Sequence, residues 1–313
     1  NSIFFDEDGT LCDASVTTYL LESSRVVVHA KRERTYHCFY EMLSGLPDEK
    51  LKKLHLDRAK LYLLLANEGQ ASATQEETAE EKRFHAQFKD LDIRNFNRLC
   101  VALRDVGFSE EDIDLTFQVL AGLVHLGDLS GAERDDDDES ATIQLDEETL
   151  QKAGELLGID PSELGSALRR RKVKVTRLGR ESIHEVPRTT LQFRHALFSL
   201  IKALYKRLFE RLVARINGSF SELRKPATGE DEVERCQIGI LDIYGFERLE
   251  LNSFEQMCIN LANERLQQFF VEEVLQAEQR MYEEERLTVL EMDLPDSTPV
   301  VLGVQNVMKL LDE

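Results

Sequence analysis

The segment QIGILDI, residues 237–243, constrains the fold of this chain more than any other feature. It is nearly all apolar and rich in β-branched residues, and it is too short and uniform for an amphipathic helix. Such a segment is typical of a strand covered on both faces, as in a parallel sheet. Ligands of parallel sheets bind beyond the carboxyl ends of the strands. We therefore expect an α/β fold with a candidate site where this strand ends.

Asp242 lies at that end, and a carboxylate there can orient water bound to a magnesium ion. The N–H of Gly245 can approach a terminal phosphate, because glycine has no side chain to obstruct it. The Asp-x-x-Gly spacing alone is a weak signal. It fits equally an aspartate that caps a turn and a glycine with positive φ, so both interpretations stay open at this point.

A long helix is predicted after this segment. Residues 246–294 contain neither glycine nor proline, and Pro295 ends the run. Ser253 and Gln256 form a capping-box pattern. Apolar residues crowd the first half of the stretch and charged residues the second half. We expect a helix of about 30 residues, roughly 45 Å long, rooted directly on the candidate phosphate site.

The rest of the chain predicts mainly helices, with a strand at residues 2–5 followed by a turn. Ser109 and Asp160 are the expected N-caps of two of the helices, and Asn217-Gly218 is the expected end of the longest. Surface loops are expected over residues 67–81 and over the acidic run 132–139. The helices are expected over residues 35–46, 48–66, 88–107, 109–127, 145–158, 160–171 and 191–217.

Residues 169–180, RRRKVKVTRLGR, carry seven basic side chains in a chain whose net charge is −20. Apolar and basic residues alternate from Lys172 to Val175, and Gly179 permits a turn, so the pattern predicts a half-exposed hairpin. A basic hairpin in an acidic protein suggests contact with an acidic partner. The alternative is an ordinary charged edge strand that guards against aggregation. The acidic remainder argues against nucleic-acid binding.

Several classes of protein are disfavoured by what the sequence contains. The five cysteines form no CxxC pair, which indicates neither a zinc site nor a disulfide framework; each is expected to pack as a small apolar side chain in a reducing, cytoplasmic setting. No apolar run is long enough to span a bilayer. None of the sixteen glycines precedes a lysine, so the phosphate-binding pattern GxxxxGK[ST] is not present. Because the sequence starts at Asn1 and not at a methionine, we expect part of a longer protein.

The chain resembles the myosin motor domain. DIYGFE (242–247) is similar to the family's switch II, and residues 252–279 are similar to the relay helix that follows it. Further family landmarks occur in the family's order. They are TYLLESSRVV, RTYHCFYEMLSGLP, VLAGLVHLGDL and HALFSLIKALYKRLFERLVARIN.

The resemblance implies a P-loop NTPase-type motor core, predominantly helical with a few central-sheet strands. Residues 1–235 would form an upper 50-kDa-like subdomain with a cardiomyopathy-type loop near 169–188. Residues 236–313 would hold the switch II strand, the relay helix and the start of a lower 50-kDa-like subdomain. The Walker A loop and switch I would lie upstream, so the chain alone is expected to be inactive.

The function implied is an actin-based motor of the cytoplasmic actin cytoskeleton that couples ATP hydrolysis to movement, with ATP and Mg²⁺ as cofactors. Light chains or calmodulin would bind a neck outside this chain, and no nucleic acid or membrane contact is expected from this segment. The alternative is a degenerate myosin-like actin-binding or scaffold protein without ATP turnover. The presence of all three switch II residues favours the motor.

The resemblance also assigns roles to particular residues. Asp242 would lie near Mg²⁺ in its second coordination shell, Gly245 would donate its N–H to the γ-phosphate, and Glu247 would pair with an arginine of switch I. Ser182 takes the place where the family carries an acidic or phosphorylatable residue, which makes it a candidate phosphorylation switch. The residues expected to contact actin are Arg171, Lys172, Lys174, Arg177 and Arg180.

Overall fold

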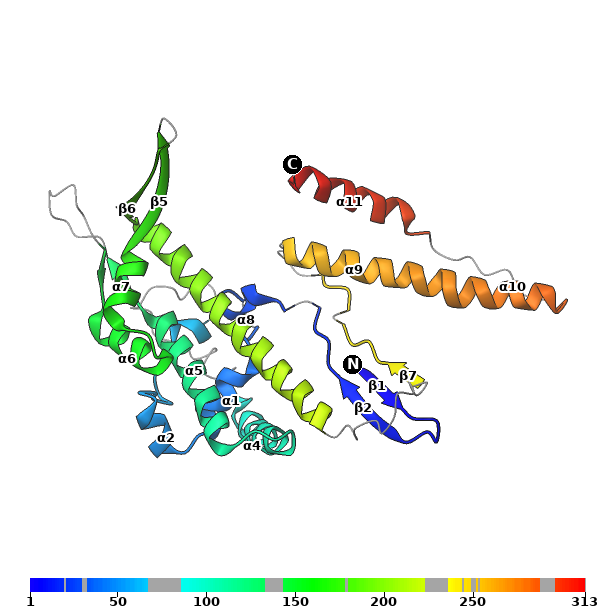
Figure 1. Ribbon diagram of the computed structural model, residues 1–313, viewed down its shortest axis with the longest axis horizontal. Coiled ribbons are helices and arrows are strands. Elements are labelled where there is room, and N and C mark those ends of the chain that lie inside the picture. The colour runs from blue at the N-terminus through cyan, green and yellow to red at the C-terminus, as the bar shows by residue number, and fades with distance from the viewer. Residues whose placement is uncertain are drawn as a thin grey trace. The chain divides into compact units, whose positions relative to one another are not determined.

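The first strand of the chain lies in the middle of a three-stranded antiparallel sheet (Figure 1). β1 (Ser2–Phe5) pairs with β2 (Leu11–Ser15) on one side and with β7 (Cys236–Gly239) on the other. The turn between β1 and β2 contains Gly9 at a φ of 76°, as the local sequence predicts. The sheet thus brings together segments that lie more than two hundred residues apart in the sequence.

The computed structural model describes residues 1–19, 21–29, 33–66, 86–132, 143–177, 180–222, 236–243, 245–248, 252, 254–287 and 296–312. The loop predicted at 67–81, almost all of that at 132–139, and the predicted cap Ser253 lie outside these residues. By its contacts the chain divides into two compact units, Asn1–Gly239 and Ile240–Glu313.

The prediction of a buried parallel strand at residues 237–243 is wrong in two respects. β7 runs antiparallel to β1, and it stands at the edge of the described sheet. Its side chains are exposed, and Ile238 retains 54% of its accessible surface. The apolar composition of a strand indicates that it needs cover. It does not indicate which residues supply that cover or in which direction the neighbouring strand runs.

Helices make up most of the first unit. Two short strand pairs accompany them: β3 (Gly131–Ala132) with β4 (Gln144–Leu145), and β5 (Arg170–Arg177) with β6 (Arg180–Pro187). Short 3₁₀ turns occur at Ser23–Val26 and Leu63–Leu65. The helices are α1 (His37–Gly45), α2 (Asp48–Lys53), α4 (Lys89–Asp105), α5 (Glu110–Asp128), α6 (Glu147–Leu157), α7 (Pro161–Arg169) and α8 (Thr190–Glu222).

Two predicted N-caps, Ser109 and Asp160, are confirmed by hydrogen bonds. The Ser109 hydroxyl accepts from the N–H of Asp112 at 3.1 Å, and the Asp112 carboxylate accepts from the N–H of Ser109 at 3.1 Å. This is a reciprocal capping box at the start of α5. The Asp160 carboxylate caps α7, with Pro161 in the first helical position.

Two predicted helix boundaries are wrong. α8 continues past Asn217-Gly218 to Glu222, because the Asn217 side chain does not end the helix but bonds the chain beside β2. Its Oδ1 accepts from the N–H of Val16 at 2.7 Å, and its Nδ2 donates to the carbonyl of Val16 at 2.9 Å. The helix predicted over 48–66 ends at Lys53, and His55 takes a left-handed φ of 55°. A leucine-rich stretch therefore forms one short helix and a 3₁₀ turn.

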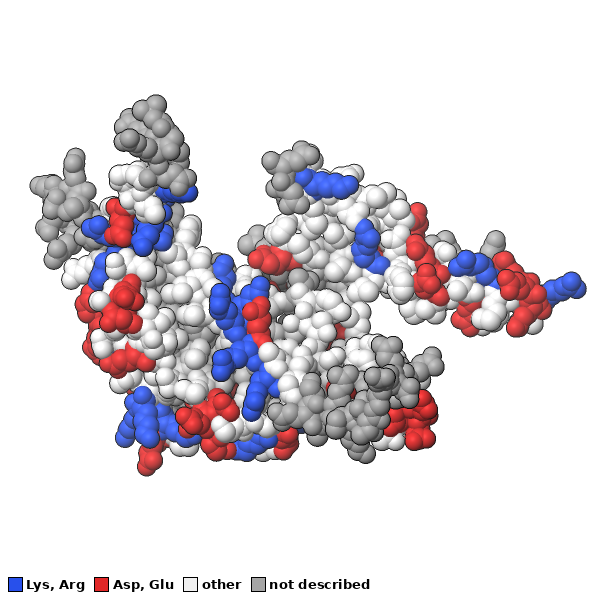
Figure 2. Space-filling view, in the orientation of Figure 1, with Lys and Arg blue, Asp and Glu red and all other residues white. Residues whose placement is uncertain are grey.

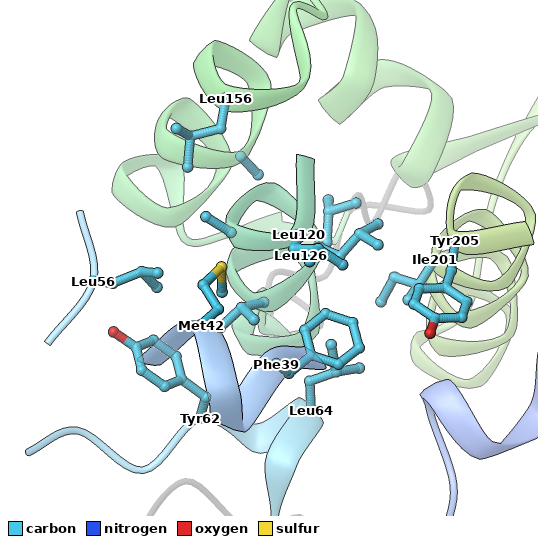
Figure 3. Packing of buried hydrophobic residues seen from close by; sticks show 14 of the residues in the cluster. Phe39, Met42, Leu56, Tyr62, Leu64, Leu120, Leu126, Leu156, Ile201 and Tyr205 are labelled. Carbon is cyan, nitrogen blue, oxygen red and sulfur yellow. The ribbon is translucent and has the colours of Figure 1, made fainter. Parts of the chain in front are cut away.

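The core of the first unit is built mainly from α1, α4, α5, α6 and α8 (Figure 3). α1 packs closely against α4: a Cβ atom added to Gly45 would lie 2.2 Å from the ring of Phe96. The side chains labelled in the figure are Phe39, Met42, Leu56, Tyr62, Leu64, Leu120, Leu126, Leu156, Ile201 and Tyr205.

A buried ion pair ties the segment before α1 to α4. The Arg34 guanidinium donates to both carboxylate oxygens of Asp92, at 2.6 and 3.1 Å. The two side chains are only 7% and 6% exposed. The guanidinium also lies 3.8 Å from the centre of the Tyr40 ring. Its Nε is buried and has no hydrogen-bond partner in the described part of the chain. The two bonds to Asp92 and the stacking on Tyr40 nevertheless give this arginine a geometry in which a buried charge is tolerated.

All five cysteines are free thiols. Burial raises the pKa of Cys38 to about 12, and Cys100 is buried, as expected for cysteines that pack as small apolar side chains. Cys236 is an exception to that expectation, because it is exposed on the edge strand β7.

The second unit is a long helical run followed by one further helix. α9 (Phe254–Phe270) continues through a π-helical segment, Val271–Gln276, into α10 (Ala277–Glu284). The prediction of a helix of about 30 residues is confirmed, although its π-helical segment was not expected. α11 (Thr298–Asp312) packs against α9. In the described part of the chain no helix is both long and apolar enough to cross a membrane.

Candidate functional site

The segment that follows β7 carries the three residues predicted to act on a nucleotide. Asp242 and Gly245 are both exposed, whereas Tyr244, between them, lies outside the described residues. Among the described residues, its own chain neighbours apart, no atom lies within 4 Å of the position that a Cβ on Gly245 would take. The backbone at Gly245 is therefore open to close approach by a ligand.

Glu247 is fixed by a pair of hydrogen bonds to the long helix. Its N–H donates to Oδ1 of Asn260 at 2.7 Å, and its carbonyl accepts from Nδ2 of Asn260 at 2.8 Å. One amide side chain thus satisfies both backbone groups of Glu247. This pair, which we call the Glu247–Asn260 clamp, connects the loop of residues 242–247 to α9.

The carboxylate of Glu247 has an unsatisfied atom. Its Oε2 is buried and makes no hydrogen bond within the described residues. Leaving such an acceptor unpaired is costly, so buried carboxylate oxygens are normally bonded. A cationic side chain from outside the described residues could donate to this oxygen.

Asn260 was not predicted from the sequence to be part of the site. It lies within a predicted helix, thirteen residues after Glu247, and a polar residue at such a position predicts nothing by itself. Only the fold of the loop back onto α9 brings the two residues together.

The described residues fit one side of a magnesium-nucleotide site. Among them no group of three or more histidine, cysteine, aspartate or glutamate side chains could hold a metal ion. Asp242 is a single exposed carboxylate, which suits contact with the water shell of Mg²⁺, an ion that keeps several of its waters. Any other ligands would have to come from the nucleotide and from residues beyond those described.

The hairpin predicted at the basic segment is confirmed as β5 and β6, which pair from Arg170↔Pro187 to Arg177↔Arg180. Residues 178–179, at the predicted turn, and the side chains of Arg177 and Arg180 lie outside the described part of the structure. Arg171, Lys172 and Lys174 are exposed, as a surface contact requires.

The register divides the charges of the hairpin. Lys172 pairs with Glu185, and Lys174 pairs with Ile183. Residues paired across two strands share a face of the sheet, so Lys172 and Lys174 lie on the face opposite to that of Arg171. One lysine therefore stands beside a carboxylate, and the basic residues form two groups instead of one continuous patch.

Ser182 is exposed on β6 and pairs with Val175 across the hairpin. Its Oγ lies 2.9 Å from Nε2 of His184, two residues along the same strand. An exposed hydroxyl on a strand can be reached by a kinase, and a phosphate there would sit close to an imidazole. The role of Ser182 remains a prediction.

The comparisons with known proteins agree on one family. A family model described as "Myosin head (motor domain)" matches residues 2–313. The chain is 35% identical to human unconventional myosin-XV over 313 residues, 99% of the chain and 8% of that protein. It is 36% identical to Myosin-4 of Saccharomyces cerevisiae over 317 residues, 99% of the chain and 20% of that protein. Human unconventional myosin-VI is 33% identical over 330 residues, 99% of the chain and 25% of that protein.

The chain thus spans a quarter or less of the length of these relatives. The matched region includes the loop, the long helix and the hairpin, and it confirms the resemblance drawn from the sequence motifs. The fold agrees with the one expected from the resemblance, because it is rich in helices and has a few sheet strands. The chain belongs to the myosin head (motor domain) family.

Proposed function

We propose that the full-length protein is an actin-based motor that couples ATP hydrolysis to movement along actin in the cytoplasmic cytoskeleton. The observation that carries this proposal is the loop of residues 242–247. It keeps Asp242 and Gly245 open, holds Glu247 through its backbone, and is connected to a long helix. A motor needs this combination of a ligand-facing loop and a stiff element that the loop can move.

In this proposal each loop residue has a separate role. Asp242 orients a water of the Mg²⁺ shell, and Gly245 donates its N–H to the terminal phosphate. Glu247 pairs with an arginine from outside the described residues, which would satisfy its buried Oε2. The magnesium nucleotide supplies the bond that is hydrolysed and the charge that these groups recognise.

The Glu247–Asn260 clamp supports a route from the loop to the helix. A displacement of Glu247 would pull directly on α9, because both backbone groups of Glu247 are bonded to Asn260. The π-helical segment Val271–Gln276 lies further along the same helical run. Segments of this kind accompany bends in helices, so the far end can change direction when the near end moves.

The same proposal includes an assignment of the chain to parts of a motor core. We assign the chain to a P-loop NTPase-type core, with residues 1–235 in an upper 50-kDa-like subdomain and residues 236–313 carrying the switch II strand and relay helix. The chain has no Gly-Lys step, so the phosphate-binding loop must come from other residues of the protein. By itself this stretch is not expected to hydrolyse ATP. Light chains or calmodulin would bind outside it.

The hairpin is proposed as an actin contact. Arg171, Lys172 and Lys174 are exposed, and a cationic surface suits an acidic filament. Arg177 and Arg180 belong to the same proposed surface through their place in the strands. Ser182, on β6, is the proposed phosphorylation switch, because a phosphate would add nearly two negative charges among these cations.

Co-sedimentation with actin tests this proposal. The full-length protein should sediment with actin without nucleotide and be released by ATP. Replacing Lys172 and Lys174 together with glutamate should weaken the affinity by about tenfold or more at low ionic strength, because two exposed attractions of up to about 1 kcal/mol each are lost and replaced by repulsions. The loss should shrink as salt is added.

The control for this test is the same double reversal at Lys52 and Lys53 on α2. Both lysines are exposed, and α2 and the hairpin lie at opposite ends of the first unit in Figure 1. Equal affinities for the hairpin variant and the unsubstituted protein would show that β5 and β6 are only a charged edge. Equal losses in the two variants would show that net charge, and not the hairpin, controls binding.

A further inference from the structure

A pocket of about 480 Å³ lies at the base of the hairpin, where α7 and β5 meet the chain that leads into α8. Four cationic residues line it: Arg170, Arg171 and Lys172 from β5, and Arg188 from the segment after β6. Figure 2 shows basic side chains gathered at this base, beside acidic ones. We call this site the basic pocket.

The charges of the basic pocket are not balanced. Its lining contains two carboxylates, Glu163 from α7 and Glu185 from β6, against the four cations. In the described structure no ion pair within 4.0 Å engages any of the four cationic side chains. Elsewhere in the first unit, cations such as Arg34 and Lys60 are paired at 2.6 and 2.7 Å. The basic pocket therefore holds a surplus of positive charge without a partner among the described residues.

Arg188 gives a second and independent indication. Its backbone N–H donates to the carbonyl of Arg169 at 2.8 Å, which fixes the residue at the junction of α7 and the hairpin. Its side-chain Nε is buried and has no hydrogen-bond partner in the described part of the chain. A buried donor on a charged group is costly when it is left unpaired. This donor has less than 1 Å² of accessible surface, so an anion in the basic pocket would accept from it once the Arg188 side chain turns toward the pocket.

We propose that the basic pocket binds a phosphate group, either free or carried on a small molecule. Phosphate offers several acceptor oxygens in a tetrahedron, and arginine guanidinium groups bind such oxygens two at a time. Ser166 also lines the basic pocket, and a serine hydroxyl can donate to a phosphate oxygen as well. The volume falls in the range of small-ligand sites. A nucleic acid is disfavoured by the net charge of −20.

This inference is independent of the proposed nucleotide site, which lies in the loop of residues 242–247. Phosphate binding by the basic pocket is tested without actin. If the pocket does not bind phosphate, the proposed motor function is unaffected. If the motor function is wrong, phosphate binding by the pocket is likewise unaffected. The probe is inorganic phosphate, titrated into the full-length protein at low ionic strength. One equivalent of a non-hydrolysable ATP analogue is present with Mg²⁺, so that the terminal-phosphate position of the nucleotide site is filled and does not contribute.

We expect saturable phosphate binding by equilibrium dialysis, and an affinity lower by about tenfold or more in Arg188→Gln, because a charge-assisted hydrogen bond is lost. Arg188→Lys should bind with intermediate affinity, since it keeps the charge and loses the paired donors. The matched control is Arg194→Gln. Arg194 is an exposed arginine of α8 outside the pocket, and that variant should bind as the unsubstituted protein does.

Arg171→Gln serves as a second variant, because Arg171 is exposed on β5 and its replacement leaves no buried group unpaired. It should also weaken phosphate binding. Vesicles of phosphatidylcholine with and without a phosphoinositide identify the source of the phosphate: competition by the phosphoinositide vesicles alone indicates a lipid headgroup. The proposal is overturned if neither phosphate nor vesicles bind, or if the Arg188 and Arg171 variants bind like Arg194→Gln.

Discussion

Replacing Glu247 with alanine should lower actin-activated ATP hydrolysis by the full-length protein by about 100-fold or more, which corresponds to about 2.7 kcal/mol in the barrier. The Glu247 carboxylate has a buried oxygen without a partner in the described residues, and we propose that a cation joins it when the loop closes. An ion pair formed only in the closed state stabilises that state selectively. ATP binding should change less than about threefold, because Asp242 and Gly245 remain.

The control for this prediction is Glu283→Ala, which removes an exposed carboxylate near the end of α10 and should hydrolyse ATP normally. Glu247→Gln should behave as the alanine variant does, since it keeps the shape and loses the charge. Hydrolysis is measured as steady-state phosphate release, and binding with a fluorescent ATP analogue. Normal turnover by Glu247→Ala would refute the proposed role of this carboxylate.

Replacing Asp92 with alanine should lower the free energy of unfolding by about 3–5 kcal/mol, because it leaves the buried charge of Arg34 without its partner. The two side chains are 7% and 6% exposed, so solvent cannot take the place of the carboxylate. The stacking of Arg34 on Tyr40 holds the guanidinium in place and hinders its escape to water. Urea denaturation followed by circular dichroism measures the change.

The comparison for this second variant is Asp114→Ala. Asp114 pairs with Lys50 at the surface, where the two side chains are 50% and 41% exposed. Surface pairs contribute about 0–1 kcal/mol, so this variant should unfold close to the unsubstituted protein. If the Asp92 and Asp114 variants lose equal stability, burial does not determine the strength of the Arg34–Asp92 pair.

Local features of the fold could be predicted from the sequence because neighbouring residues determine them. The Ser109 and Asp160 caps act within three residues, and the hairpin follows from the alternation of basic and apolar residues from Lys172 to Val175. The long helix after residue 252 could be predicted from the absence of glycine and proline. In each case the signal and the structure lie in the same short stretch.

Features that depend on distant contacts could not be predicted. α8 passes the expected stop at Asn217 because that side chain bonds Val16, far away in the sequence. The direction of β7 depends on β1, at the other end of the chain. The Glu247–Asn260 clamp needs the loop to fold back onto its own helix. The motif was enough to identify the residues of the candidate site, but only the structure shows that the loop is bonded to α9.

We propose that the loop of residues 242–247 belongs to a working motor. The most direct test is the rate of ATP hydrolysis by the full-length protein as actin is added. A working motor should show slow Mg²⁺-dependent hydrolysis that rises with actin concentration and saturates. An ATPase rate that stays at background while actin still binds would contradict it, and would identify the protein as a myosin-like actin-binding or scaffold protein without turnover.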